Sequence, residues 1–233
     1  MTRYGVLRGV GVGPGDPELM TLKSTALLRA STTIAYVVDE QGESYARRIA
    51  EGFFPVSVHE VPLFFSMSPD RSKRLAARAE AVRQVMGLLD AGNDVTFITE
   101  GDPLLYSTFQ YLLSGISPDI PVEICPGISA LNASAAEASF PLLTEDERMV
   151  VATLTPESIQ RLPEWLKSFD AIVLFKVHRH MGALAAALDE AQYQGRTVLV
   201  QRASLSGQAM VTDLADWDRS PLPYFTIALI RSA

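Results

Sequence analysis

Two short loops rich in glycine and proline constrain the fold of this chain more than any other feature. Gly11–Pro17 follows the strand-like run Gly5–Val10, and Glu100–Pro103 follows the strand-like run Asp94–Thr99. Glycine lets the backbone approach a ligand closely and tolerates positive φ, while proline fixes the turn. Open α/β sheets bind their ligands at loops that follow the carboxyl ends of strands. The two loops therefore indicate an α/β enzyme that acts on a small molecule.

Composition limits the kinds of molecule that this chain is expected to bind. The chain has 233 residues, of which 48% are hydrophobic, enough for a large core. Its net charge of −7 argues against nucleic acid or an anionic membrane as a partner, although a local basic patch could still bind an anionic substrate. The single cysteine, Cys125, excludes an intrachain disulfide and a multi-thiolate metal site. Without a signal-peptide pattern or a long apolar run, we expect a soluble, cytoplasmic protein.

Strand-like and helix-like segments alternate along the chain, which predicts a mostly parallel sheet. Apolar runs of strand length occur at Thr33–Val38, Val56–Val61, Val95–Thr99, Val122–Cys125, Met149–Leu154, Ala171–Phe175, Thr197–Gln201 and Phe225–Ile230. Helical spacing occurs at Pro17–Ala30, Arg71–Ala91, Ser129–Ala138, Pro156–Ser168 and His180–Gln192, the first of these with Asp16 as its N-cap.

The segment Ser114–Pro121 is the best candidate for a domain boundary, because it contains two prolines, a glycine and two serines. It divides the chain almost in half. The sequence therefore predicts two α/β domains, residues 1–116 and 117–233, with a ligand cleft between them. A single continuous sheet is the alternative.

The first loop partly matches a dinucleotide-binding motif, since Gly11 and Gly13 follow a strand and precede a helix. However, Asp16 stands where the third glycine is expected, and a carboxylate there would repel a pyrophosphate. Pro14 and Pro17 also remove two amide donors. We therefore favour a loop that lines another kind of ligand over a dinucleotide site or a purely structural turn.

A third motif, Cys125–Ala130, joins a strand to a helix of small residues, where Ser129 can cap the helix or donate to a ligand. Together, Gly11–Lys23, Glu100–Tyr106 and Cys125–Ala130 resemble the tetrapyrrole (precorrin) methylase family in order and spacing over essentially the whole chain. Four further segments resemble the branch of that family that methylates carbon-20 of precorrin-2 or its cobalt form: Gly42–Ala50, Phe175–His180, Gln201–Ser204 and Pro223–Ala228.

The resemblance implies a cobalamin-pathway enzyme with two α/β domains, which forms a homodimer and holds S-adenosylmethionine in the cleft between its domains. Methyl transfer from a sulfonium to carbon needs no metal, so no metal site is expected. The residues implied as cofactor contacts are Pro14, Gly101, Asp102, Leu104, Ser129 and Ala130, with Val177, Ala203 and Thr226 near the adenosine.

The implied substrate is an anionic tetrapyrrole with eight carboxylate side chains, so basic residues are expected around it. The candidates are Arg47, Arg48, Lys176 and Arg179. A proton must leave the ring after methylation, and Asp16 and Glu100 are the nearby carboxylates in sequence; each also suits a structural role. The chain departs from the family pattern at Val177-His178, between Lys176 and Arg179, and at residues 106–108.

The sequence is also compatible with other functions. The protein could be another tetrapyrrole methylase, acting on uroporphyrinogen III or a later precorrin. It could also be a nicotinamide-dependent oxidoreductase, which Asp16 disfavours, or a tetrapyrrole-binding protein without activity. The sequence does not distinguish a metal-free substrate from a cobalt-containing one.

Overall fold

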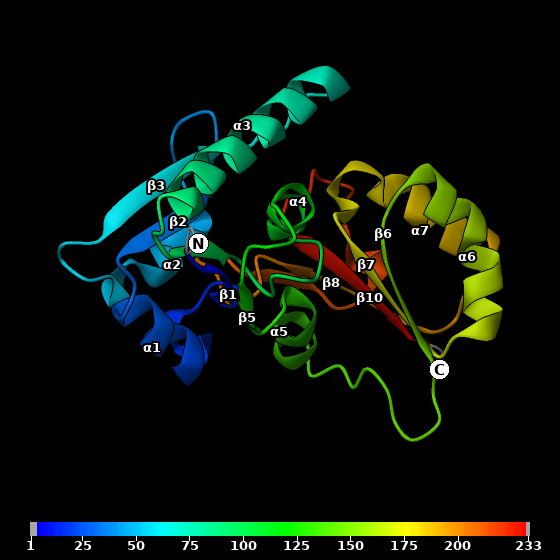
Figure 1. Cartoon of the computed structure of the whole chain (residues 1–233). Helices are drawn as coiled ribbons and strands as arrows, with labels where there is room; N and C mark the ends of the chain where they lie inside the picture. The colour runs from blue at the N-terminus through cyan, green and yellow to red at the C-terminus, as the bar shows by residue number, and fades with distance from the viewer. Residues whose placement is uncertain (1–3, 232–233) are drawn as a thin grey trace. The chain divides into compact units, whose positions relative to one another are not determined.

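The computed structural model describes residues 4–231, which form an α/β fold of two compact units that divide after Ser129. Each unit contains its own five-stranded sheet (Figure 1). The α/β fold class predicted from the sequence is confirmed, and a single continuous sheet is not what forms. In residues 4–231, no helix is long and apolar enough to span a membrane.

The first unit has a fully parallel sheet with the strand order β3-β2-β4-β1-β5. Its strands are β1 (Leu7–Gly11), β2 (Thr33–Val38), β3 (His59–Phe64), β4 (Val95–Thr99) and β5 (Val122–Cys125). Gly11 is paired with Thr99 in the register of β1 and β4. The two glycine loops therefore leave the sheet side by side at its carboxyl edge.

Helices cover both faces of this sheet (Figure 1). They are α1 (Leu22–Arg29), α2 (Tyr45–Ala50), α3 (Arg71–Asp90) and α4 (Phe109–Gly115), with 3-10 turns η1 (Pro17–Leu19) and η2 (Glu51–Phe53). Leu28 of α1 and Ile49 of α2 pack in one core cluster, while Val85 of α3 and Phe109 of α4 pack in the cluster on the opposite face.

The neighbouring strands β1 and β4 are followed by helices on opposite faces of the sheet. The connection after β1 leads to α1, and the connection after β4 leads to α4. The gap between β1 and β4 is thus a topological switch point, the place where open α/β sheets bind ligands outside the carboxyl ends of their strands.

The second unit has a mixed sheet with the order β6-β7-β10-β8-β9. Its strands are β6 (Met149–Thr153), β7 (Ala171–Phe175), β8 (Arg196–Gln201), β9 (Ala209–Val211) and β10 (Thr226–Arg231). Only β6 and β7 pair in parallel among the described strands of this sheet. Its helices are α5 (Ala130–Glu137), α6 (Pro156–Ser168) and α7 (Met181–Glu190), with 3-10 turns η3 (Val177–Arg179) and η4 (Leu214–Asp216).

Three expectations about the fold need correction. The sheet of the second unit is mostly antiparallel, not parallel, because β10 inserts between β7 and β8. The division lies after Ser129 rather than after residue 116, because β5 pairs with β1 and so belongs to the first sheet. The expected helix Pro17–Ala30 is interrupted: η1 ends at Leu19, and α1 starts after Thr21, whose side chain accepts from Ser24 N.

Candidate functional site

Three loops meet backbone to backbone at the switch point of the first unit. The N–H of Gly101, after β4, donates to the carbonyl oxygen of Gly13, after β1, at 2.8 Å. The third loop, after β5, brings Gly127 to the same place, within reach of Gly11 and Gly101. The three motifs that carry the family resemblance therefore form one structural cluster.

Glycine is required in this cluster for two different reasons. A Cβ on Gly11 would lie 2.4 Å from the Gly101 oxygen, and a Cβ on Gly127 would lie 2.1 Å from the same atom. Both distances are shorter than any real carbon contact, so a side chain at either position would force the loops apart. Gly13 and Gly101 have φ of 80° and 64°, in the left-handed region that glycine adopts without strain.

Asp102 holds two of these loops together. Its Oδ2 accepts a hydrogen bond from Gly127 N at 3.1 Å, and its Oδ1 accepts one from Leu104 N at 2.8 Å. Leu104 itself is half-exposed, with 52% of its surface accessible, and Pro14 is buried. The carboxylate of Asp102 thus has a structural role, which leaves the loop backbone and Leu104 as the groups available to a ligand.

The two carboxylates considered for catalysis already accept hydrogen bonds from backbone amides. Asp16 Oδ1 accepts from Glu18 N at 2.8 Å and caps η1. Glu100 Oε1 accepts from Ala46 N at 2.9 Å, and burial raises the pKa of Glu100. The structural roles considered for both residues are therefore present, and a catalytic role stays a prediction for each.

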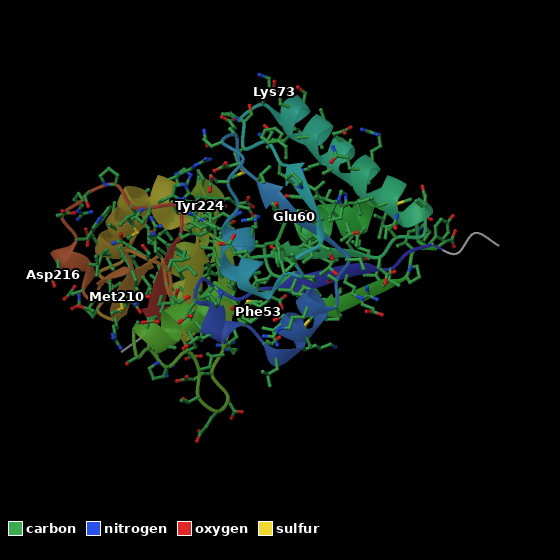
Figure 2. All side chains as sticks on the ribbon, turned by 90° about the vertical axis from the view of Figure 1, so that its left-hand side faces the viewer. Phe53, Glu60, Lys73, Met210, Asp216 and Tyr224 are labelled. Carbon is green, nitrogen blue, oxygen red and sulfur yellow. The ribbon has the colours of Figure 1, made fainter. Side chains whose placement is uncertain are left out.

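The guanidinium of Arg47 forms hydrogen bonds with carboxylates of the protein itself. Its Nε and Nη2 donate to both oxygens of Glu60 on β3, at 2.7 and 3.2 Å, and its Nη1 donates to Glu51. Figure 2 labels Glu60. Tyr36 donates to the same carboxylate at 2.7 Å. The hydrogen bond from Arg47 holds the pKa of Glu60 below its usual value. Sequence reasoning missed this network because Arg47 lies on α2 and Glu60 on β3, and only the fold brings them together.

The other basic candidates are more exposed. The guanidinium of Arg48 lies over the ring of Tyr45, 4.3 Å from its centroid, and both residues belong to α2. Lys176 and Arg179 are exposed at the end of β7. Partial desolvation of its ammonium group by the surrounding protein, and then the charge of Arg179, lower the pKa of Lys176.

The three expected adenosine contacts of the second unit lie at one edge of its sheet. Val177 follows β7, Ala203 follows β8 and Thr226 begins β10, and all three are buried. Thr226 Oγ1 donates to the carbonyl oxygen of Pro223 at 2.7 Å. The side chain of Val177 packs in the core, so its backbone is the part that a ligand at this edge could reach.

The loops at this edge contain residues in an uncommon conformation. Lys176, Arg202 and Ser204 have φ of 58°, 51° and 59°. His178, which departs from the family pattern, lies against Tyr224, with ring centroids 5.2 Å apart. Burial, and then the charge of Arg179, lower the pKa of His178. Backbone strain in non-glycine residues is common at functional sites, and no sequence signal indicated it here.

The loops of the first unit suit a cationic ligand better than a pyrophosphate. Gly11–Pro17 and Glu100–Leu104 contain Asp16, Glu100 and Asp102 but no lysine or arginine. Proline at two positions removes amide donors, and the Gly101 amide is already bonded to Gly13. A dinucleotide loop needs free amides aimed at phosphate, so this arrangement argues against a nicotinamide cofactor.

The sequence profile of the tetrapyrrole (corrin/porphyrin) methylases matches residues 6–217. The chain belongs to the tetrapyrrole methylase family. Among curated members, it is 30% identical to the precorrin-2 C(20)-methyltransferase of a Sinorhizobium species, covering 97% of this chain and 95% of that protein. It is 31% identical to the cobalt-precorrin-2 C(20)-methyltransferase of Salmonella typhimurium, covering 97% and 96%.

This family member also matches longer proteins and solved structures. It is 32% identical to the cobalamin biosynthesis protein CobIJ of Mycobacterium tuberculosis over 99% of this chain, but it spans only 46% of that protein. The methyltransferase CobJ shares its fold with a TM-score of 0.75 at 21% identity, covering 98% of this chain and 95% of that one. Uroporphyrin-III C-methyltransferase from Thermus thermophilus, complexed with S-adenosylhomocysteine, has a TM-score of 0.69 at 21% identity, covering 97% of each.

Proposed function

We propose that this protein is an S-adenosylmethionine-dependent methyltransferase that methylates carbon-20 of precorrin-2, or of its cobalt form, in cobalamin biosynthesis. The observation that carries the proposal is the cluster of three glycine loops at the switch point of the first sheet. The names of the relatives that match nearly end to end support carbon-20 as the position.

The cofactor contacts of this proposal are those that the family resemblance implies: Pro14, Gly101, Asp102, Leu104, Ser129, Ala130, Val177, Ala203 and Thr226. When bound, S-adenosylmethionine supplies a methyl group activated by a positively charged sulfur. The loop carbonyls and nearby carboxylates stabilise positive charge, and the absence of basic side chains from the two loops avoids repelling it.

The task of the protein in such a reaction is mainly orientation. Holding two reactants in line at close distance can lower a barrier by about 7–11 kcal/mol in the best cases. Rigid loops packed backbone to backbone are suited to this, because no side-chain rotation can displace them. Exclusion of water by the surrounding residues strengthens the electrostatic interactions in the site.

The basic residues that bind the carboxylates of the tetrapyrrole are Arg48, Lys176 and Arg179. Arg47 contributes less directly, because its guanidinium is already bonded to Glu60 and Glu51. An anionic substrate beside Lys176 would counteract the lowering of its pKa and so favour the charged form.

Formation of S-adenosylhomocysteine, measured with three candidate substrates, tests the proposal. Precorrin-2 and cobalt-precorrin-2 should support turnover, with one or both preferred over uroporphyrinogen III. Turnover with uroporphyrinogen III alone would reassign the protein to another branch of the family. No turnover with any tetrapyrrole, together with no binding of S-adenosylhomocysteine, would contradict the proposal altogether.

We also propose that the protein works as a homodimer in the cytoplasm, on the strength of the family resemblance. Sedimentation velocity at micromolar concentration tests the assembly state. A single species with twice the mass of 25.4 kDa is expected, and a monomer would contradict it.

A further inference from the structure

Glu100 connects the second glycine loop to a different element of the first unit. It directly precedes the loop Gly101–Leu104, and its Oε1 accepts the N–H of Ala46 at 2.9 Å across 54 residues of sequence. Ala46 is the second residue of α2, so its N–H has no partner within the helix. The N–H of Arg47 is accepted by Ser44 Oγ at 3.2 Å. One acceptor at the start of α2 is therefore local, and the other comes from the end of β4.

α2 needs such contacts, because a helix of six residues is not stable on its own. Ala46, Ile49 and Ala50 are buried in the core cluster on this face of the sheet, and they fix the apolar side of the helix. Arg47 fixes the polar side through Glu60. The bond from Glu100 adds a direct connection between this helix and the residue next to Gly101.

We infer that Glu100 is a positioning residue that couples the loop Gly101–Leu104 to α2, so that a ligand held at the loop also fixes the segment that carries Arg47 and Arg48. The identity of that ligand rests on the proposed function. A ligand bound at the loop Gly101–Leu104 should therefore also restrict the motion of the segment Gly42–Ala50. Binding at the loop thereby holds α2 and its two arginines in place before an anionic substrate binds.

A positioning role differs from that of a general base in what it requires of the carboxylate. A base must come within hydrogen-bonding distance of the proton that it removes, whereas positioning requires only that Oε1 accept the N–H of Ala46. Burial of a carboxylate is costly, and this hydrogen bond offsets part of that cost. Glutamine can accept the same bond but cannot take up a proton, so the two roles can be separated by substitution.

Hydrogen–deuterium exchange of the full chain, with and without S-adenosylhomocysteine, tests the coupling. In the wild type and in Glu100→Gln, the compound should slow exchange both at residues 101–105 and at residues 45–48. In Glu100→Ala, only residues 101–105 should respond. Ser44→Ala is the matched control: it removes the local cap, so basal exchange in α2 should rise while the response to the compound remains.

Kinetics provide a second measurement. Glu100→Ala should raise KM for the tetrapyrrole about tenfold, as expected for a lost hydrogen bond to a buried carboxylate, with little change in affinity for S-adenosylhomocysteine. Glu100→Gln should keep kcat and the pH profile of the wild type. Should Glu100→Ala fail to fold, Glu100→Asp shortens the reach to α2 and should weaken the coupling in the same direction.

Two outcomes would overturn the inference. The first is an α2 response to S-adenosylhomocysteine in Glu100→Ala that equals the wild-type response. The second is a large loss of kcat in Glu100→Gln together with the disappearance of the acidic limb of the pH profile, because that result identifies a base. If S-adenosylhomocysteine protects nothing in the wild type, the proposed function fails instead.

Discussion

The two units stabilise their loops in different ways. In the first unit, the loops after β1, β4 and β5 pack so closely that Gly11 and Gly127 have no room for a side chain. In the second unit, the loops after β7 and β8 contain Lys176, Arg202 and Ser204, which keep their side chains in a left-handed conformation that glycine would adopt more easily. Positions 11 and 127 of the first unit exclude side chains, whereas positions 176, 202 and 204 of the second unit retain them despite strain, as Tyr106 after β4 also does. This difference indicates that close backbone packing fixes the loops after β1, β4 and β5. In the loops after β7 and β8, it indicates that the strained side chains themselves have a role.

Substitution of Gly11 should destabilise the protein most. Gly11→Ala places a Cβ 2.4 Å from the Gly101 oxygen, so the free energy of unfolding should fall by about 3 kcal/mol and affinity for S-adenosylhomocysteine should drop. Chemical denaturation and calorimetry measure the two quantities. Gly87→Ala in α3 is the control: nothing lies within 4 Å of its Cβ, so the substitution should stabilise the protein by about 1 kcal/mol. An unchanged stability of Gly11→Ala would show that the loops can move apart freely.

A smaller effect is expected at Lys176. Because this residue has a φ of 58°, Lys176→Gly should be more stable than Lys176→Ala by about 1 kcal/mol. The two variants lose the same ammonium group, so the difference in thermal unfolding isolates the backbone strain. Both should bind the tetrapyrrole more weakly than the wild type. If the alanine and glycine variants unfold at the same temperature, Lys176 is not strained, and the two units do not differ in backbone strain at this position.

The smallest effect is pH-dependent and concerns Glu60. Arg47 lowers the pKa of this carboxylate in the folded protein, so its contribution to stability is complete above the pKa of the unfolded chain. The contribution is lost as pH falls through the lowered folded pKa. Glu60→Gln should therefore be less stable than the wild type at pH 7 by up to about 1 kcal/mol, since the pair is partly exposed. Denaturation curves should converge as pH falls below about 4; a constant difference across this range would exclude the ion pair as the cause.

Local sequence signals predicted most elements of the fold. The strands β2, β4, β5 and β7 match the apolar runs, and α6 matches its predicted bounds, because Thr155 and Pro156 form a strong helix start. The helix α2 and the strand β9 were not predicted, since six and three residues are too short for a periodic pattern. The antiparallel insertion of β10 depends on tertiary pairing, which no local pattern encodes.

The candidate site could be predicted only in part. The glycine loops are visible in the sequence, but Gly11 and Gly127 prove to contact the backbone of another loop, and that requires knowing the strand order. The ion pair of Arg47 with Glu60 and the bond between Glu100 and Ala46 join residues far apart in sequence. The expected cofactor contacts of the second unit come from the resemblance to the family, because composition and periodicity could not identify them.

The position of the transferred methyl group decides whether the protein is a carbon-20 methyltransferase. Precorrin-2 and cobalt-precorrin-2 would be incubated separately with the enzyme and with S-adenosylmethionine labelled with ¹³C in its methyl group, and the products examined by NMR. A single new ¹³C-methyl signal at carbon-20 is expected with at least one of the two substrates. A new methyl at any other ring position, or no incorporation into either substrate, would contradict the assignment.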